Sequence, residues 1–332
     1  MRILFNRYSL FPLTIILIIS IIVAFRDYSI GVDTLNYVDN YIYNGSYEGF
    51  EPAFRAVIKF FNLLTTDPTL FFGFICFFIT IFYYKTYEEL DYNHKPYYTL
   101  ILFSLLLFSS WYINANTNGI RQGMSLAVLY YAYVKYFFNK KYFKFTIFYI
   151  ISISFHYSTF MVLPFLFLYL LSLKHIVLIW LCVGLLYILG FNEIIFYNVL
   201  NILGQSDIYF KVKNYSEGEI MYHGFHWSFF FYTIFFPLFS LFLSYLTKNK
   251  EFLPIPLLKF YMILNLPFFI LGFSNYSNRY AVVSWFLIPL LQLSIIKQMD
   301  FSKHSLKFIS ISLFCFGIIY FYLFRINILG NF

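Results

Sequence analysis

The chain has 332 residues, of which 61% are hydrophobic, 26% aromatic and only 11% charged, and its formal net charge is +8. A soluble domain is about half apolar and about a quarter charged, so this chain lacks the polar residues needed to cover a water-soluble core. The composition excludes a soluble enzyme, a nucleic-acid-binding protein and a disordered chain, and it predicts an all-α polytopic membrane protein.

Apolar runs recur from one end of the chain to the other. They lie at about 10–25, 68–84, 97–113, 120–138, 145–172, 175–190, 226–246, 256–273, 280–296 and 308–324. The run 145–172 is too long for one crossing, because a helix rises about 1.5 Å per residue and the hydrocarbon core is about 30 Å thick. His156 interrupts it near the middle. It is either one tilted helix or two short helices that meet at His156.

The distribution of lysine favours two short helices. With two passes at 145–172, most lysines lie on the inner side, as the positive-inside rule requires, whereas one pass would move the later lysine clusters outside. We therefore expect about 11 transmembrane helices, some short or broken, in a single integral membrane domain over residues 1–332. Two longer loops, at about 26–67 and 191–225, then lie on the outer face.

Arginine follows a different pattern from lysine. Five of the seven arginines lie on the predicted outer side or at its edge. A guanidinium binds phosphate through two parallel hydrogen bonds, so this excess predicts a phosphate-bearing ligand at the outer face. The five are Arg26, Arg55, Arg121, Arg279 and Arg325.

The first outer loop carries two acids of interest, Asp33 and Glu51. Either is a candidate base or a ligand for sugar hydroxyls. Pro52 suits the first turn of a helix, and the amphipathic segment 52–64 is typical of a helix that lies along the membrane surface. The simpler interpretation is a solvated loop in which Glu51 caps the helix and pairs with Arg55.

Two arginines follow short polar loops in the same way. Arg121 follows the loop 114–119 and Arg279 follows the loop 275–278, each near the start of an apolar helix. Backbone N–H groups at a helix start favour anions, so together these arginines are candidates to hold the two phosphates of a pyrophosphate. The simpler interpretation of each is an anchor that reaches lipid headgroups.

His156 is an ionisable residue between two apolar stretches, a position where a functional role is the first hypothesis. A neutral imidazole there can accept a proton from an attacking hydroxyl. The alternative is a histidine that only hydrogen-bonds a neighbouring helix.

The sequence predicts no metal and no cofactor. Three cysteines lie far apart in apolar runs, and the pair His223 and His226 has no cysteine or carboxylate placed beside it. We expect both histidines at the membrane interface. Nucleotide-binding and serine-hydrolase motifs are also missing.

Four short motifs follow one another along the first half of the chain: Gly31-Val32-Asp33-Thr34-Leu35-Asn36-Tyr37, Glu51-Pro52-Ala53-Phe54, Arg121-Gln122 and Phe155-His156-Tyr157-Ser158. Together they resemble the EpsG family of Wzy-like O-antigen, capsule and exopolysaccharide polymerases. The second half of the chain is similar in hydropathy and in Asn278-Arg279-Tyr280, and Ala53 stands where the family has a longer, glycine-rich Glu-Pro-Gly run.

The resemblance implies a glycosyltransferase of the bacterial inner membrane with its active site toward the periplasm or exterior. It would transfer a glycan from undecaprenyl pyrophosphate to a second lipid-linked repeat unit, both held in the lipid bilayer. No cofactor and no nucleic acid would be needed. A flippase and a chain-length regulator would be its protein partners. The residues implied are His156, Asp33 and Glu51 for catalysis, Arg121, Arg279 and Arg55 for pyrophosphate, and Tyr37, Gln122 and Tyr280 for sugar.

Two other functions remain open from the sequence. A flippase for lipid-linked oligosaccharide would need charges through the membrane midplane, whereas the predicted charges gather near the outer face. A membrane O-acetyltransferase would act on the same glycan.

Overall fold

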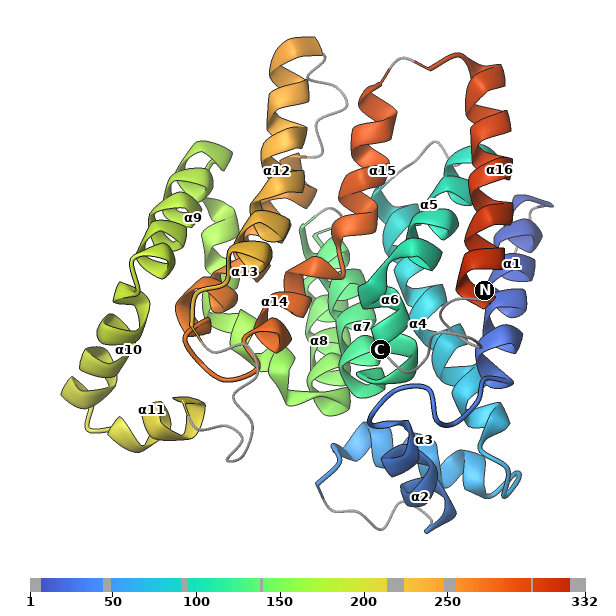
Figure 1. Ribbon diagram of the computed structural model, residues 1–332, viewed down its shortest axis with the longest axis horizontal. Helices are drawn as coiled ribbons and strands as arrows, with labels where there is room; N and C mark the ends of the chain where they lie inside the picture. Colours follow the sequence, from blue (N-terminus) through green and yellow to red (C-terminus); the bar gives the residue numbers. More distant parts are fainter. Residues whose placement is uncertain are drawn as a thin grey trace. The chain divides into compact units, whose positions relative to one another are not determined.

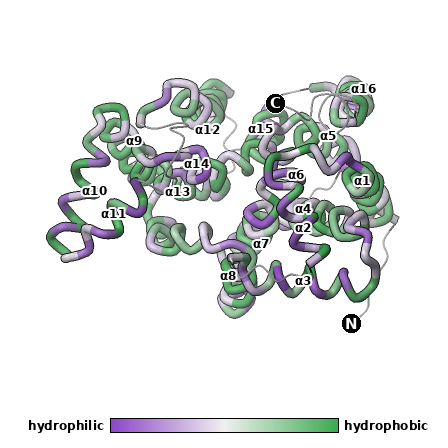
Figure 2. Tube along the Cα trace, turned by 60° about the horizontal axis from the view of Figure 1, so that its bottom comes forward, coloured by the Kyte–Doolittle hydropathy of each residue, from purple (hydrophilic) through white to green (hydrophobic). Residues whose placement is uncertain are grey.

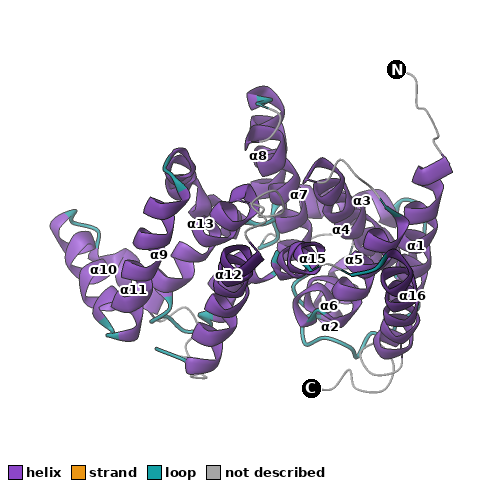
Figure 3. Cartoon of the chain, turned by 90° about the horizontal axis from the view of Figure 1, so that it is seen from above, coloured by secondary structure: helices purple, strands orange, loops and turns teal. Residues whose placement is uncertain are grey.

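The computed structural model describes residues 7–43, 49–90, 95–137, 140–213, 224–247, 255–299 and 301–322. Within these residues every regular element is a helix, and none is a strand (Figure 3). The chain divides into two compact units, which we call unit 1 (Met1–Thr159 with Phe301–Phe332) and unit 2 (Phe160–Asp300). The helical class predicted from composition is therefore confirmed.

Unit 1 is built around α7, whose residues are buried along most of its length, with α4 and α8 packed against it. The middle of α7 is mostly apolar, which suits this central position. Helix α1 packs on α4, and α16 packs on α5 (Figure 1). The helices of unit 1 are α1 Arg7–Ala24, α2 Thr34–Ile42, α3 Pro52–Asn62, α4 Thr69–Leu90, α5 Pro96–Phe108, α6 Ser110–Thr117, α7 Ile120–Phe137, α8 Tyr142–Phe155 and α16 Lys303–Tyr320.

Helix α3 is the amphipathic helix predicted for segment 52–64. Pro52 is its first residue, and Glu51 is its N-cap in extended conformation. Phe54 and Ile58 are buried while Lys59 is exposed, so one face is apolar and the other polar, which Figure 2 shows as alternating colours along α3. The burial of the apolar face fixes the position of Glu51 at the start of the helix.

The chain breaks at His156, as the interruption of the apolar run predicted. Helix α8 ends at Phe155, His156 is extended (φ −162°, ψ 125°), and a 3-10 helix, η1, runs over Tyr157–Leu170. A 3-10 helix rises about 2.0 Å per residue, so the 14 residues of η1 extend roughly 28 Å. Because of this greater rise per residue, η1 is nearly as long as a hydrocarbon core is thick, although it has few residues.

Unit 2 packs around α13, where buried polar side chains pair with one another. Trp180 Nε1 donates to Asn265 Oδ1 at 2.9 Å, and Asn265 Nδ2 donates to Ser284 Oγ at 3.2 Å. The helices of unit 2 are α9 Leu173–Ile188, α10 Phe191–Ile202, α11 Ser206–Lys213, α12 Trp227–Thr247, α13 Ile255–Leu271, α14 Asn278–Trp285 and α15 Ile288–Gln298.

Three helical segments in the described residues are long and apolar enough to cross a membrane: Thr69–Leu90, Trp227–Leu246 and Asn278–Gln298. The number rises to five if two bent pairs are each one span: α5 with α6, bent by 68°, and α9 with α10, bent by 98°. Shorter apolar helices lie at Leu10–Ala24, Tyr142–Phe155, Tyr157–Leu170 and Ile255–Leu271. A helical membrane protein is confirmed, whereas the number of about eleven crossings, their orientation and the single domain over 1–332 stay predictions.

Both predicted outer loops contain helices. The segment 26–67 includes α2 and α3, and the segment 191–225 includes α10 and α11. Glycines in the left-handed conformation separate these elements: Gly190 (φ 72°) lies between α9 and α10, and Gly204 (φ 68°) lies between α10 and α11. A left-handed residue ends a helix, so one apolar stretch becomes short helices joined by sharp turns.

Candidate functional site

The carboxylate of Glu51 is the centre of a polar cluster in unit 1. Its Oε2 accepts a hydrogen bond from Arg121 Nη1 at 2.6 Å, and its Oε1 lies 2.5 Å from His156 Nδ1. The backbone N–H of Tyr157 approaches Oε1 at 3.4 Å. Glu51 itself is only 3% exposed. The structure therefore brings together three of the residues that the sequence singled out separately.

Each member of the cluster lies at the end of a helix. Glu51 precedes the first turn of α3, Arg121 is the second residue of α7, and His156 occupies the junction of α8 and η1. Gly123 lets α6 and α7 approach closely, since a Cβ there would lie 2.7 Å from Ala115. All three side chains thus start from the ends of helices whose packing is fixed.

The surroundings of Glu51 keep its carboxylate ionised. Burial by itself would raise the pKa of Glu51, but the hydrogen bond from His156 and the charges of His156 and Arg121 outweigh it and hold the pKa at about 2. A carboxylate with so low a pKa is a poor proton acceptor at neutral pH. Glu51 is therefore suited to orienting its two partners rather than to acting as the base.

The contact with Glu51 determines which nitrogen of His156 is available. Because Nδ1 faces the carboxylate, it carries the proton, and the lone pair of the neutral ring lies on Nε2. The side chain of His156 is 27% exposed, so the ring is accessible. Its backbone carbonyl accepts hydrogen bonds from Ser125 Oγ at 3.3 Å and Thr159 Oγ1 at 3.0 Å, which hold the junction in place.

Arg121 is held by several neighbours, which include the hydroxyl of Tyr37. Its guanidinium lies 4.5 Å from the centre of the Phe50 ring, and Nη1 is bound to Glu51. Its Nε is buried and has no hydrogen-bond partner among the described residues. With a side chain that is 24% exposed, Arg121 retains hydrogen-bonding capacity for an anion.

Glu51 does not pair with Arg55, so the simpler interpretation of this acid is wrong. The link between them is backbone to backbone, from the Arg55 N–H to the Glu51 carbonyl at 3.1 Å. The Glu51 side chain makes no capping hydrogen bond. Contacts with two partners from distant parts of the chain, Arg121 and His156, take the place of a local pair across one helical turn.

Helix α2 lies against the turn that precedes Arg121, through contacts that the sequence did not reveal. Asn118 Oδ1 accepts from the Asp33 N–H at 2.8 Å, and the Tyr37 hydroxyl donates to the Asn118 carbonyl at 3.0 Å. The Tyr37 ring packs against Phe50 and Phe54. Tyr37 is therefore engaged in packing, and its predicted contact with sugar is untested. Asn118 was visible only as one polar residue of a loop.

The remaining residues predicted in this unit flank the cluster. The carboxylate of Asp33 is half-buried and makes no ion pair within the described chain. Gln122 follows Arg121 in α7 and is half-buried, as is Arg55 in α3. Their predicted roles in catalysis, sugar binding and phosphate binding stay predictions.

Arg279 repeats the local arrangement of Arg121 within unit 2. It is the second residue of α14, and its guanidinium lies 4.6 Å from the centre of the Tyr276 ring. Arg279 and Tyr280 come directly after the predicted loop. The side chain of Arg279 is exposed, and that of Tyr280 is half-buried. Because Arg121 and Arg279 belong to different units, a pyrophosphate clamp shared by the two arginines stays a prediction.

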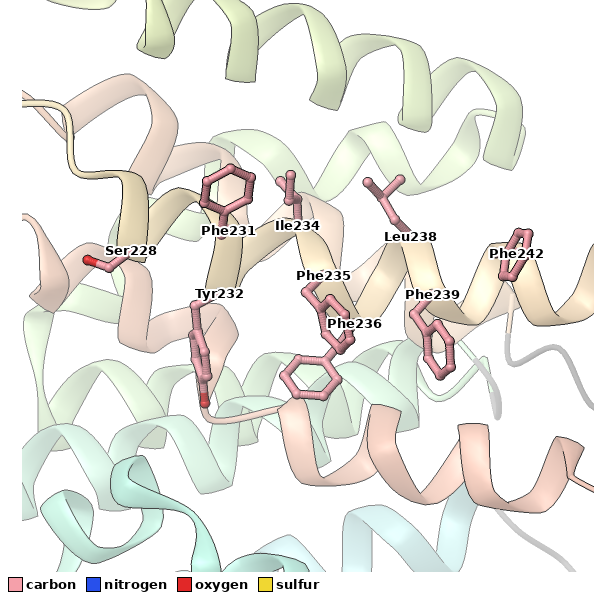
Figure 4. Close-up of a pocket in the computed structure, with 9 residues that line it drawn as sticks. All are labelled: Ser228, Phe231, Tyr232, Ile234, Phe235, Phe236, Leu238, Phe239 and Phe242. Carbon is pink, nitrogen blue, oxygen red and sulfur yellow. The ribbon is translucent and has the colours of Figure 1, made fainter.

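The described residues show no metal centre at this cluster, and a hollow lies elsewhere, on α12. Across the described ranges no group of three His, Cys, Asp or Glu side chains could hold a metal ion, and His223 lies outside them. A hollow of about 640 Å³ is lined by α12 alone, from Ser228 to Phe242, with Phe and Leu side chains on it (Figure 4). It contains no charged residue, so we assign it no chemistry.

Comparison with known proteins identifies a family for this chain. No curated protein and no solved structure is detectably similar to the chain. The model of the EpsG family matches residues 9–331, which include every member of the Glu51 cluster. The predicted resemblance is confirmed: this chain belongs to the EpsG family, a family of Wzy-like polymerases.

Proposed function

We propose that the chain is a polysaccharide polymerase of the bacterial inner membrane, which transfers a growing glycan from undecaprenyl pyrophosphate to a second lipid-linked repeat unit at the outer face. Family membership supports the polymerase class. The observation that supports the chemistry is the Glu51 carboxylate bound between Arg121 and His156. It combines an orienting acid, a basic imidazole and a cation in one place.

The transfer forms one bond and breaks another. A hydroxyl oxygen of the acceptor sugar attacks the anomeric carbon of the donor glycan, and the bond from that carbon to the pyrophosphate oxygen breaks. His156 Nε2 accepts the hydroxyl proton, and the imidazolium that results is stabilised by Glu51 at Nδ1. The departing undecaprenyl pyrophosphate takes the bonding electrons.

Arg121 stabilises the charge that develops on the departing pyrophosphate. Its guanidinium is already fixed by Glu51 and Phe50, so little reorganisation is needed when the negative charge grows. A diphosphate is a good leaving group, so this mechanism requires no nucleotide. Arg279 and Arg55 remain candidates for further phosphate contacts, and Asp33, Gln122 and Tyr280 for sugar hydroxyls.

Reconstitution of the purified chain with lipid-linked repeat units tests this function. The wild type should produce a ladder of polymer on a gel, and His156→Ala and Arg121→Ala should not. His175→Ala is a matched control, because His175 is an exposed histidine whose Nδ1 hydrogen-bonds the nearby Ser172 hydroxyl. Ladders from a folded His156→Ala protein would remove the base assignment.

A transport assay separates the polymerase from a flippase. In cells with the same two substitutions, single repeat units should still reach the outer leaflet, because the cluster acts on chain growth. Loss of delivery together with loss of polymer would instead favour a flippase.

A further inference from the structure

Arg26 is a buried arginine that the polymerase mechanism does not use. It follows α1 and is only 3% exposed, although its neighbour Phe25 is 77% exposed. Its guanidinium lies 4.1 Å from the centre of the Phe72 ring on α4, and Nη1 donates to the Val23 carbonyl at 3.4 Å. It therefore lies one layer below the surface at the end of a predicted span.

One edge of this guanidinium is unpaired. Nε and Nη2 of Arg26 are both buried and have no hydrogen-bond partner in the described part of the chain. These two nitrogens point the same way from the planar group, and they form the edge through which arginine binds phosphate or carboxylate in two-point fashion. The edge that is free is thus the one suited to an oxyanion.

No acid within the described residues neutralises Arg26. Asp67, the acid that contacts the neighbouring Tyr28, accepts hydrogen bonds from Tyr28 and Thr69. Burial lowers the pKa of Arg26 to about 10, which still leaves it charged at neutral pH. A buried charge without a counter-ion destabilises the folded state, so a compensating interaction is expected.

A row of buried phenyl rings connects Arg26 with Arg121. The ring of Phe72 under Arg26 packs on Phe71 at 5.3 Å, and Phe71 packs on Phe54 at 5.9 Å. Phe54 then packs on Phe50 at 5.4 Å, and Phe50 carries the guanidinium of Arg121. The two arginines therefore lie at the two ends of one aromatic row within unit 1.

We propose that Arg26 is a second phosphate-binding residue, which holds the phosphate of a lipid-linked molecule through Nε and Nη2. This inference rests on the proposed function, because a polymerase of this kind binds two lipid-linked substrates at once and needs an anion site for each. Arg121 serves the donor, whose bond breaks, and Arg26 serves the acceptor, whose phosphates stay attached. The exposed Phe25 beside Arg26 is placed to contact the lipid chain.

Binding of undecaprenyl phosphate to the full chain in phosphatidylcholine nanodiscs tests the proposal. The assay uses an Arg121→Ala background, so that Arg26 is measured without the donor site. Arg26→Met should raise the dissociation constant about tenfold or more, because the two-point contact is lost. Lys59→Met, which removes an exposed positive charge from α3, should leave it unchanged.

A second substitution covers loss of folding in Arg26→Met. Arg26→Lys keeps the charge and removes the planar edge, so it should also weaken binding. An unchanged dissociation constant in either folded variant overturns the proposal. Arg26→Met removes an unpaired buried charge. In the absence of ligand, this variant should therefore unfold at the same temperature as the Arg121→Ala protein or at a higher one.

Two parallel titrations, each with a different lipid, identify which kind of lipid phosphate Arg26 binds. Saturation by undecaprenyl phosphate but not by phosphatidylglycerol in the same nanodiscs identifies the polyprenyl substrate, and equal saturation by both identifies bulk headgroups. The assay involves no turnover. If Arg26→Met binds undecaprenyl phosphate normally, the His156 polymerisation experiment still tests the proposed function. If no variant affects polymer synthesis, the binding measurement still tests the role of Arg26.

Discussion

Glu51 Oε1 and His156 Nδ1 lie 2.5 Å apart, although 105 residues separate them in the chain. The same carboxylate binds Arg121 through its other oxygen. The three side chains therefore act as one unit, in which loss of the central acid leaves two cationic or basic partners without their acceptor. Substitutions within such a unit should be non-additive.

The first prediction concerns Glu51→Gln. Glutamine has nearly the same shape but no charge, so it cannot hold Arg121 and the Nδ1–H of His156 together. We expect polymer synthesis to fall at least about tenfold. The free energy of unfolding should also fall, by about 1–3 kcal/mol, because buried donors lose a charged acceptor. Gel ladders and thermal unfolding measure the two effects.

Glu193→Gln is the matched control for that change. Glu193 pairs with Lys213 at 2.8 Å, but both side chains are about one-third exposed. Exposed pairs contribute about 0–1 kcal/mol, so this variant should keep both stability and ladders. Equal losses in the two glutamine variants would contradict a special role for Glu51.

The low pKa of Glu51 predicts how acid affects stability. Its folded value of about 2 lies below its ordinary value of 4.5. A lowered pKa means that the ionised group stabilises the folded state fully above pH 4.5, and that this contribution disappears as the pH falls toward 2. The gap in stability between wild type and Glu51→Gln should therefore narrow across this range. Unfolding curves from pH 6 to pH 2.5 measure it, and a constant gap would refute the assignment.

Much of the local structure could be predicted from the sequence because its causes are local. Pro52 and alternating polarity indicated α3, and the interrupted run indicated the break at His156. The number of spans could not be predicted as well, because η1 is a 3-10 helix and because α5 with α6 and α9 with α10 bend sharply. Hydropathy measures how apolar a segment is and contains no information on rise per residue or bend.

The members of the Glu51 cluster could be singled out from the sequence, but their contact with one another could not. Glu51, Arg121 and His156 each stood out as a polar residue beside an apolar helix. Their meeting at one carboxylate depends on long-range packing, because 70 and 105 residues separate Glu51 from its partners. Phe50 escaped notice among 48 phenylalanines, since its stacking on Arg121 follows only from the fold.

The third prediction separates the base from the hydrogen bond in His156. In His156→Asn the amide nitrogen takes a position near that of Nδ1 and can still donate to Glu51, but no atom replaces Nε2. The protein should therefore fold with wild-type stability and lose about a hundredfold or more in polymerisation rate. His156→Ala should lose both. Substantial synthesis by His156→Asn would exclude His156 Nε2 as the base.

The fourth prediction concerns the geometry of Arg121. In Arg121→Lys the charge remains, but the planar group that contacts Phe50, Glu51 and an anion together is lost. We expect the polymerisation rate to fall about a hundredfold, while the KM for lipid-linked substrate changes less. Lys135→Arg, in the last turn of the same helix where Lys135 pairs with Glu89, should retain activity. Full activity in Arg121→Lys would show that any cation suffices.

The last prediction concerns Gly31, which positions α2 against the turn before Arg121. Its φ is +93°, and an added Cβ would lie 2.8 Å from Thr34 Oγ1 and 3.0 Å from the Thr117 backbone. Thr34 Oγ1 donates to the Thr117 carbonyl at 2.8 Å, so the same crowding would separate α2 from that turn. Gly204 has a similar φ of +68° with nothing within 4 Å of a Cβ.

Comparison of Gly31→Ala with Gly204→Ala isolates the effect of crowding. Both variants lose about 1 kcal/mol because alanine disfavours a left-handed backbone. Gly31→Ala should lose about 1–3 kcal/mol more, because its methyl group displaces Thr34 and Thr117. It should also reduce ladder formation, since the displaced turn leads directly into Arg121. If thermal unfolding and ladders are the same in the two alanine variants, the contact of Gly31 with Thr117 has no part in holding Arg121 in place.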